Sequence, residues 1–204
     1  MPQVRVHYDF ASTLCYVAHR LMQRMAPDLA ELDVELAWSP LDLSSLTGWP
    51  RGAAVPEPRR ANAARVAQEL GVEVSVPRVW PDSRWANAAA LVVDAAGDED
   101  RSATWRERVF SAVFEERRSP LDAAAVASLA RELGFTLDPG ALRTAREALP
   151  AHTREAAAEE VTGVPTFMLD AWAFGGIQSQ ETMLSIFERW VRRRGRAPDG
   201  PVPS

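Results

Sequence analysis

The sequence contains no lysine, and all 23 of its basic residues are arginine. Mechanisms that need a lysine amine, such as Schiff-base formation, are therefore excluded. Only one cysteine is present, Cys15, so no intramolecular disulfide can form and no internal dithiol–disulfide cycle can operate. Because a single cysteine also fits a reducing compartment, we expect a cytoplasmic protein.

Metal-ligand clusters, long apolar runs and excess positive charge are missing too. The three histidines, His7, His19 and His152, do not lie at metal-ligand spacing with one another or with Cys15, so no metal site is expected. No segment approaches the ~18 apolar residues that span a bilayer, and the N-terminus lacks a signal-peptide pattern. The net charge of −5 argues against a nucleic-acid or anionic-membrane partner, because counterion release needs a basic surface.

The overall composition is typical of one or two globular domains: the chain has 204 residues, of which 47% are hydrophobic. Alternating apolar residues predict a strand at 3–9, and Ser12 is a suitable N-cap for a helix ending near Pro27. A second strand is expected at 32–38, stopped by Pro40. Since two strands joined by a helix should be parallel, the chain opens as a βαβ unit.

A loop rich in glycine and proline follows at 44–58, which suits a binding loop or a plain connector. About 100 residues of helical pattern come next. The expected helix boundaries there are Asp82 and Gly97, a capping box of Thr104 and Glu107, Gly134, and finally Asp138 and Pro150. The end of the chain predicts two short strands with a turn near Asp170, and a helix with Gly195 at its end.

Two motifs about 150 residues apart carry a family resemblance. "DFASTLCY" resembles the "DF-C-x-x-C-Y" segment of thioredoxin-fold proteins of the DsbA type, and "GVPTFML" resembles their "GVPTF" segment with a cis-proline. "FGGIQSQETM" is similar to the family's turn into the last helix. The resemblance implies an α/β thioredoxin-like fold, βαβ plus ββα, with a large all-helical insertion. It places a discontinuous thioredoxin-like domain at 1–43 and 162–196, the helical insertion at 57–161 and a flexible tail at 197–204.

The sequence departs from this family at its first active-site cysteine. Ser12 stands at that position, and Cys15 takes the place of the second, resolving cysteine. A serine here resembles the kappa-class glutathione transferases and 2-hydroxychromene-2-carboxylate isomerases, whose "SSPY" segments "ASTL" resembles. That resemblance implies that the Ser12 hydroxyl bonds the sulfur of bound glutathione. A plain N-cap explains Ser12 equally well.

Cys15 lies in the first turn of the expected helix, where unpaired backbone N–H groups and the helix dipole favour an anion. A free cysteine has a pKa of ~8.5, and a helix N-terminus lowers it, so an exposed Cys15 would be partly thiolate near neutrality. A buried Cys15 would act as a small hydrophobe. We expect His19 to be a solvated helix residue and His7 a hydrogen-bonded core histidine.

Pro165 would be trans on general grounds, since only ~5–6% of X–Pro bonds are cis. The resemblance reverses this expectation. It implies that Val164 offers its backbone N–H and C=O to a peptide or to glutathione, which would pair as an added strand. Thr13, next to Ser12, is a further candidate for binding the same thiol or peptide ligand.

Other residues are candidates for binding the remainder of a ligand. Trp49, in the glycine-rich loop, is a candidate pocket wall, although with Trp38, Trp80 and Trp85 it is also a candidate core residue. Gln178 and Ser179 begin the last helix, where backbone N–H groups could hold a carboxylate.

Three functions remain open. The first is a DsbA-family, thiol-dependent oxidoreductase, or disulfide isomerase, in which Cys15 reacts with an external thiol as a mixed disulfide or sulfenic acid. The second is a glutathione-dependent isomerase or transferase, and the third is a redox-inactive peptide-binding protein. No tightly bound cofactor is expected. Glutathione or another low-molecular-weight thiol, or a peptide, would be the partner, and the resemblance makes a homodimer an option.

Overall fold

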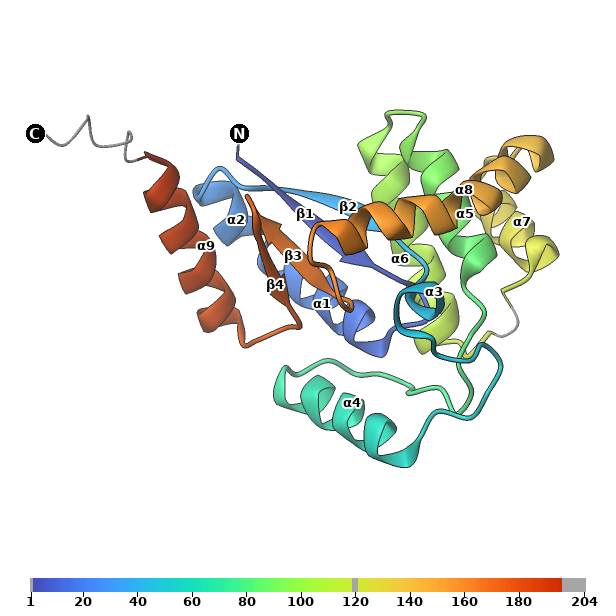
Figure 1. Cartoon of the computed structure of the whole chain (residues 1–204), viewed down its shortest axis with the longest axis horizontal. Coiled ribbons are helices and arrows are strands. Elements are labelled where there is room, and N and C mark those ends of the chain that lie inside the picture. The colour runs from blue at the N-terminus through green and yellow to red at the C-terminus, as the bar shows by residue number, and fades with distance from the viewer. Residues whose placement is uncertain (1, 119–120, 196–204) are drawn as a thin grey trace, which may run out of the picture.

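The computed structural model describes residues 2–118 and 121–195, and a four-stranded mixed sheet lies at its centre (Figure 1). The strand order is β2-β1-β3-β4. Strand β1 (Gln3–Tyr8) pairs in parallel with β2 (Glu35–Pro40) and antiparallel with β3 (Thr166–Leu169). Strand β4 (Trp172–Gly175) pairs antiparallel with β3 through a turn at Asp170, as predicted. The sheet therefore has the expected βαβ plus ββα topology.

The other regular elements of the described chain are helices. Helices α1 (Thr13–Arg24) and α2 (Ala26–Glu31) make the crossover between β1 and β2, and α9 (Gln180–Gly195) follows β4. The segment between β2 and β3 is helical, with α3 (Leu43–Thr47), α4 (Glu57–Glu69), α5 (Arg84–Asp94), α6 (Glu99–Phe114), α7 (Ala123–Glu132) and α8 (Pro139–Ala158). In Figure 1, α5 to α8 lie together on one side, whereas α4 projects away from them. The fold is thioredoxin-like with a helical insertion, as expected.

The core joins the sheet to both helical parts. Tyr8 and Phe10 are fully buried and meet edge-on, with ring centroids 5.1 Å apart. Phe110 of α6 packs against Phe10 at 4.8 Å. Such aromatic pairs add to the stabilisation from area burial, so the inserted helices and the sheet share one apolar core.

A polar network on α1 and α6 corrects two predictions. His19 is 4% exposed rather than solvated, and its Nε2 lies 2.9 Å from Oε2 of Glu107. Glu107 sits inside α6, which begins at Glu99 with Asp98 as its N-cap, so Thr104 and Glu107 do not form a capping box. Hydrogen bonds from His19 and Gln23, together with Arg20, lower the pKa of Glu107 to about 2. The carboxylate thus ties α1 to the insertion.

Prolines end fewer elements than the sequence pattern predicts. Pro150 lies inside α8, which continues to Ala158 because Thr153 and Ala156 are buried against the loop before α3. The hydroxyl of Thr153 accepts a hydrogen bond from the Asp42 backbone N–H at 2.9 Å. Tertiary packing thus overrides the local signal at Pro150. Pro40, by contrast, ends the edge strand β2 as predicted, and its missing N–H is tolerated there.

Helix starts also differ from prediction in places. α1 ends at Arg24, near Pro27 as predicted, but a second helix follows directly, and Pro27 lies in the first turn of that helix, α2, which suits its fixed φ. Ser83 rather than Asp82 precedes α5, and Asp82 instead pairs with Arg84. Part of the predicted loop at 44–58 forms α3. The expected tail at 197–204 lies outside the described residues.

Across residues 2–118 and 121–195, no helix combines the length and apolar character required to cross a bilayer. In the same residues no group of three or more potential metal-ligating side chains comes together.

His7 of β1 is buried, with 2% of its surface exposed, but it is not the hydrogen-bonded core histidine that we expected. Neither ring nitrogen has a hydrogen-bond partner among the described residues. Burial, with a smaller contribution from the nearby charge of Arg5, lowers the pKa of His7 to about 4. The imidazole is therefore neutral in the folded protein at neutral pH.

His7 should make the protein less stable in mild acid. Its imidazole takes up a proton near pH 6.5 in the unfolded chain but only near 4 in the folded one, so the unfolded state binds the extra proton between these values. Since a shift of one pKa unit corresponds to about 1.36 kcal/mol, the free energy of unfolding should fall by up to roughly 3 kcal/mol as the pH drops from 7 to 4. His7→Leu should remove this part of the loss.

Urea denaturation of the wild type and His7→Leu at pH 7 and pH 4 measures the effect. The carboxylates and His19 titrate in both proteins, so their contribution cancels in the comparison. Equal losses of stability in the two proteins would show that His7 does not titrate differently on folding.

Candidate functional site

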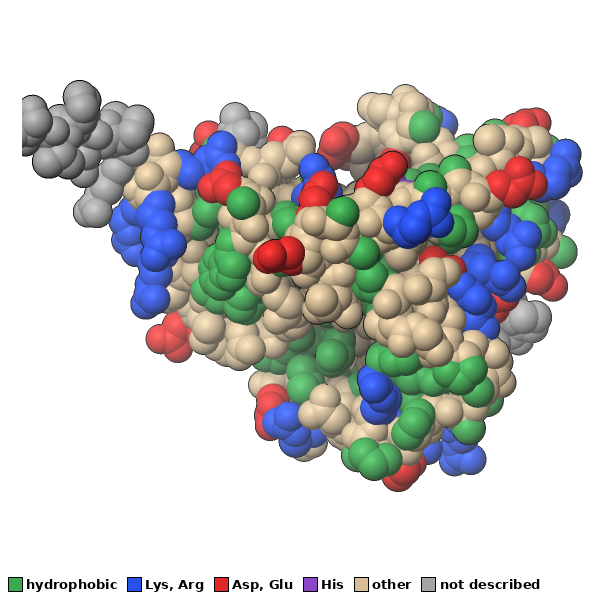
Figure 2. Space-filling view, viewed as in Figure 1, with side chains coloured by type: hydrophobic (Ala, Val, Ile, Leu, Met, Phe, Trp, Pro, Cys, Tyr) green, Lys and Arg blue, Asp and Glu red, His purple; other side chains and the backbone are tan. Residues whose placement is uncertain are grey.

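A pocket opens where the N-terminus of α1 meets the α3–α4 loop, α4 and the loop before α5. It encloses about 600 Å³, counting the space at its open mouth. In Figure 2, hydrophobic side chains lie on both sides of the hollow between α4 and the rest of the molecule. The pocket is lined by Ala11, Ser12, Thr13, Leu14, Trp49, Val55, Arg59, Arg60, Asn62, Ala63, Val76, Pro77, Trp80, Pro81 and Val164. A concave site lined mainly by hydrophobic and aromatic side chains, with a few polar groups, is typical of small-molecule binding.

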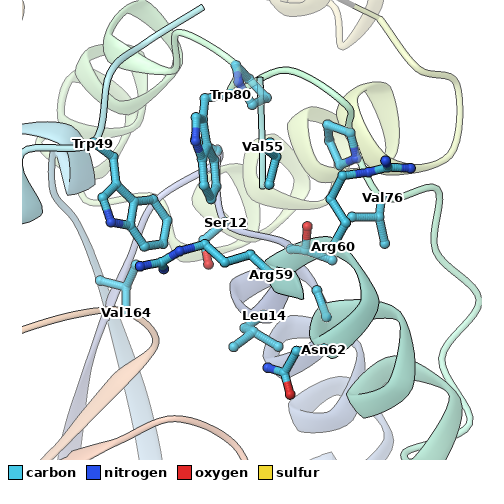
Figure 3. A pocket seen from close by; sticks show the side chains of 15 residues that line it. Ser12, Leu14, Trp49, Val55, Arg59, Arg60, Asn62, Val76, Trp80 and Val164 are labelled. Carbon is cyan, nitrogen blue, oxygen red and sulfur yellow. The ribbon is translucent and has the colours of Figure 1, made fainter. Parts of the chain in front are cut away.

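Four of the predicted site residues meet in this pocket: Ser12, Thr13, Trp49 and Val164. They come from three separate parts of the chain (Figure 3). The Val164–Pro165 peptide bond is cis, and Pro165 is buried behind Val164. Among the described residues, the backbone N–H and C=O of Val164 have no hydrogen-bond partner.

Ser12 is the N-cap of α1, with an extended backbone at φ −92° and ψ 115°. Its Oγ accepts the Cys15 backbone N–H at 3.3 Å, and its carbonyl accepts the Tyr16 N–H at 3.2 Å. The backbone N–H groups of Thr13 and Leu14, the first two of the helix, have no acceptor among the described residues. Both residues line the pocket, so the helix presents its positive end there.

Cys15 lies behind this surface, not on it. The side chain is 0% exposed, and Cys15 is not among the residues that line the pocket. Burial raises the pKa of the thiol to about 12, although hydrogen bonds from Ser12 and from the Asp9 backbone favour the thiolate. Of the two alternatives left open by the sequence, the structure shows the buried thiol, and the helix dipole does not compensate for the loss of solvent.

Asp9 holds the turn that carries Ser12, and the sequence analysis missed it. The carboxylate is fully buried: Oδ1 accepts the Ala11 N–H at 2.7 Å and the Ser83 hydroxyl at 2.5 Å, and Oδ2 accepts the Leu43 N–H at 2.7 Å. The Asp9 carbonyl also accepts the Ser12 N–H at 3.0 Å. Burial raises the pKa of Asp9, while these donors oppose the rise. One side chain thus joins the starts of α1, α3 and α5.

Asn87 extends the support beneath Asp9. Its Oδ1 accepts the Phe10 N–H at 3.3 Å, and its amide nitrogen donates to the Leu41 carbonyl at 2.8 Å. These groups are buried, and each hydrogen bond removes the cost of leaving a buried backbone group unpaired. A charged residue directly after an apolar strand, in "HYDF", was the available sequence signal for this network.

Two tryptophans form one wall of the pocket. Trp49 and Trp80 lie with ring centroids 4.2 Å apart and an angle of 32° between their planes. The guanidinium carbon of Arg59 lies 4.2 Å from the Trp49 ring centroid, and Figure 3 shows this group between Trp49 and Val164. Among the described residues Arg59 has no ion-pair partner. Trp80 is therefore a pocket wall and not only a core residue.

Gln178 and Ser179 do not contribute to this pocket. Both are exposed, and the Ser179 hydroxyl caps α9 by accepting the Thr182 N–H at 3.3 Å. The expectation that they hold a carboxylate of the same ligand finds no support in this geometry.

Solved structures similar to this one include both isomerases and oxidoreductases. A 2-hydroxychromene-2-carboxylate isomerase matches with a TM-score of 0.71 and 23% identity, over 95% of this chain and 98% of that one. A probable DsbA oxidoreductase from Streptomyces coelicolor has a TM-score of 0.72 and 20% identity, over 99% and 94%. The cytosolic disulfide reductase DsbM from Pseudomonas aeruginosa with GSH has a TM-score of 0.59 and 20% identity, over 95% of this chain and 97% of that one.

At these identities the structural matches establish the fold alone. No curated protein sequence matches the chain. The family described as the DsbA-like thioredoxin domain, however, matches residues 3–188, which is most of the chain. With its thioredoxin-like sheet, its inserted helices and its serine at the mouth of α1, the chain belongs to the DsbA-like thioredoxin domain family.

Proposed function

We propose that the protein is an isomerase or transferase that depends on a low-molecular-weight thiol, and that the reacting sulfur belongs to the ligand. One observation carries this proposal. Ser12 lies on the pocket at the N-terminus of α1, whereas Cys15 is fully buried behind it. Of these two residues only Ser12 lines the pocket, although no more than 6% of its surface is exposed, and its hydroxyl can donate a hydrogen bond to a sulfur bound there.

The mouth of α1 suits a thiolate. The Ser12 hydroxyl and the N–H groups of Thr13 and Leu14 can donate to the same anion, and the helix dipole adds its positive end. Hydrogen bonds to the charged form lower the pKa of a thiol. A bound thiol would then be ionised near neutral pH without any protein base.

Val164 supplies the second anchor. Val164 lines the same pocket, and its backbone N–H and C=O, which have no partner among the described residues, could pair with the peptide groups of a ligand such as glutathione. The 2-hydroxychromene-2-carboxylate isomerase and the DsbM structure with GSH support this assignment by their fold.

The apolar walls suit the second reactant. Val55, Ala63 and the paired indoles offer a flat, hydrophobic surface beside the sulfur position. The ligand thiolate would attack an electrophilic carbon of an apolar substrate held there. In a transferase a leaving group departs and a thioether remains, and in an isomerase the thiolate leaves again after rearrangement.

Oxidoreductase chemistry at Cys15 is the weaker candidate. A mixed disulfide or a sulfenic acid needs an accessible thiolate, but this thiol is 0% exposed and its pKa is about 12. The oxidoreductases among the similar structures share the fold, and this chain has Ser12 where the DsbA-type motif that it resembles has its first cysteine.

A thermal-shift comparison tests the proposal. Glutathione should raise the melting temperature of the wild type, since a ligand that binds only the folded state stabilises it by RT ln(1 + [L]/Kd). The shift should shrink strongly in Ser12→Ala and persist in Cys15→Ala. Each shift is measured against the same variant without ligand, because removing an N-cap alone costs ~1 kcal/mol.

S-methylglutathione, which cannot form a thiolate, is the matched ligand control and should give a smaller shift. A shift that survives in Ser12→Ala but disappears in Cys15→Ala would overturn the proposal and restore the cysteine as the reacting group.

A further inference from the structure

A second groove, rich in arginine, begins at the edge of the thiol pocket. It is lined by residues that include Arg60, Arg78, Arg117 and Arg118, and it holds about 1240 Å³, counting its open side. No carboxylate is among its lining residues, although the whole chain has 28 acidic residues against 23 arginines. The positive charge of this groove is therefore a local feature.

The groove and the pocket are continuous. Arg60, Val76, Pro77 and Pro81 line both of them. Arg59 and Arg60 leave α4 in opposite directions, with Arg59 under Trp49 and Arg60 on the Val76 side (Figure 3). A ligand with its sulfur at Ser12 could thus pass Arg60 and extend into the groove.

Several hydrogen-bond donors of the groove arginines have no partner among the described residues. Arg78 and Arg117 have no ion-pair partner among the described residues, and both are exposed. Arg60 pairs with Glu57, but its Nε is buried and has no partner in the described chain. Arg118 is the exception, because Glu116 and Glu132 hold it. The two exposed guanidinium groups of Arg78 and Arg117 therefore remain for an anion.

We infer that the low-molecular-weight thiol of this protein carries phosphate groups at the end remote from its sulfur, and that the groove binds them. Arginine presents a planar fork of donors that matches phosphate oxygens. A small apolar or zwitterionic thiol would leave the groove empty. This inference rests on the proposed function, because it assumes that the sulfur lies at Ser12.

Binding of three probes, measured by titration calorimetry at low and high salt, tests the inference. Coenzyme A has both a thiol and phosphates, glutathione has only the thiol, and adenosine 3′,5′-bisphosphate has only the phosphates. We expect coenzyme A to bind more tightly than glutathione. Its affinity should fall about tenfold or more in Arg78→Ala/Arg117→Ala and should weaken with salt, as charge-assisted contacts do.

The matched control is Arg65→Ala/Arg154→Ala, which removes the same charge from exposed positions outside the groove. It should leave coenzyme A binding within about twofold of the wild type, since distant charges are screened by salt. Glutathione binding should be the same in both double variants.

The outcomes separate the two proposals. If coenzyme A and glutathione bind equally and the groove variant changes neither, the inference fails while the proposed function stands. If adenosine 3′,5′-bisphosphate binds through Arg78 and Arg117, but Ser12→Ala weakens the binding of neither coenzyme A nor glutathione, the groove binds phosphate and the proposed function fails. If none of the three binds, the inference is overturned.

Discussion

Cys15 of the native protein is expected to react with iodoacetamide at pH 8 at least ~1000-fold more slowly than the same thiol in the urea-unfolded chain. A pKa of about 12 leaves roughly 10⁻⁴ of the thiol ionised at this pH, against about a quarter for a free cysteine with a pKa near 8.5. Its complete burial slows the reagent further, because access requires the surrounding structure to open. Mass spectrometry of the alkylated protein over time gives both rates.

The variant Ser12→Cys/Cys15→Ala is the matched control for this measurement. It moves the single thiol three residues, from the core to the pocket at the start of α1, where the unpaired N–H groups of Thr13 and Leu14 favour the thiolate. Its thiol should react at least as fast as that of the unfolded chain. If native Cys15 were alkylated at a similar rate, the thiol would have to be accessible, and oxidoreductase chemistry at this residue would again be favoured.

The contrast between Ser12 and Cys15 shows how far the sequence could predict the site. The N-cap role of Ser12 is local, because its side chain bonds the N–H three residues later, and the prediction needed no other part of the chain. The burial of Cys15 depends on which side of α1 meets the sheet and α6. Helical spacing gives that face only when the packing partners are known.

The fold, too, has features that short segments determine and features that depend on distant packing partners. The alternation in β1 and the turn at Asp170 are properties of short segments, and both predictions are confirmed. Pro150 was wrongly predicted to end its helix because the burial of Thr153 and Ala156 comes from segments more than 100 residues earlier. Ser12, Thr13, Trp49 and Val164 were predicted as site residues from the sequence, and all four line the pocket. Arg59 reaches it because α4 packs against α1, and Trp80 reaches it because its backbone pairs with Gly52 and Ala53 of the α3–α4 loop.

Asp9 is the clearest case of a site residue whose role depends on distant partners, and its removal should be very destabilising. Asp9→Ala leaves three buried donors without an acceptor: the Ala11 N–H, the Leu43 N–H and the Ser83 hydroxyl. Each unsatisfied buried group costs about 1–3 kcal/mol. We expect the free energy of unfolding to fall by about 3–5 kcal/mol, measured by urea denaturation, which is a large fraction of the stability of a typical domain.

Asp9→Asn separates the hydrogen bonds from the shape of the side chain. The amide fills the same space but has one acceptor oxygen, and its NH₂ group must face at least one of the three donors. The loss should therefore be smaller, about 2–3 kcal/mol. Asp100→Asn makes the same chemical change on the exposed first turn of α6 and should alter stability by no more than about 0.5 kcal/mol. If Asp9→Ala lost no more than Asp100→Asn, the starts of α1, α3 and α5 would not depend on this carboxylate, and the turn that presents Ser12 would be fixed by backbone packing alone.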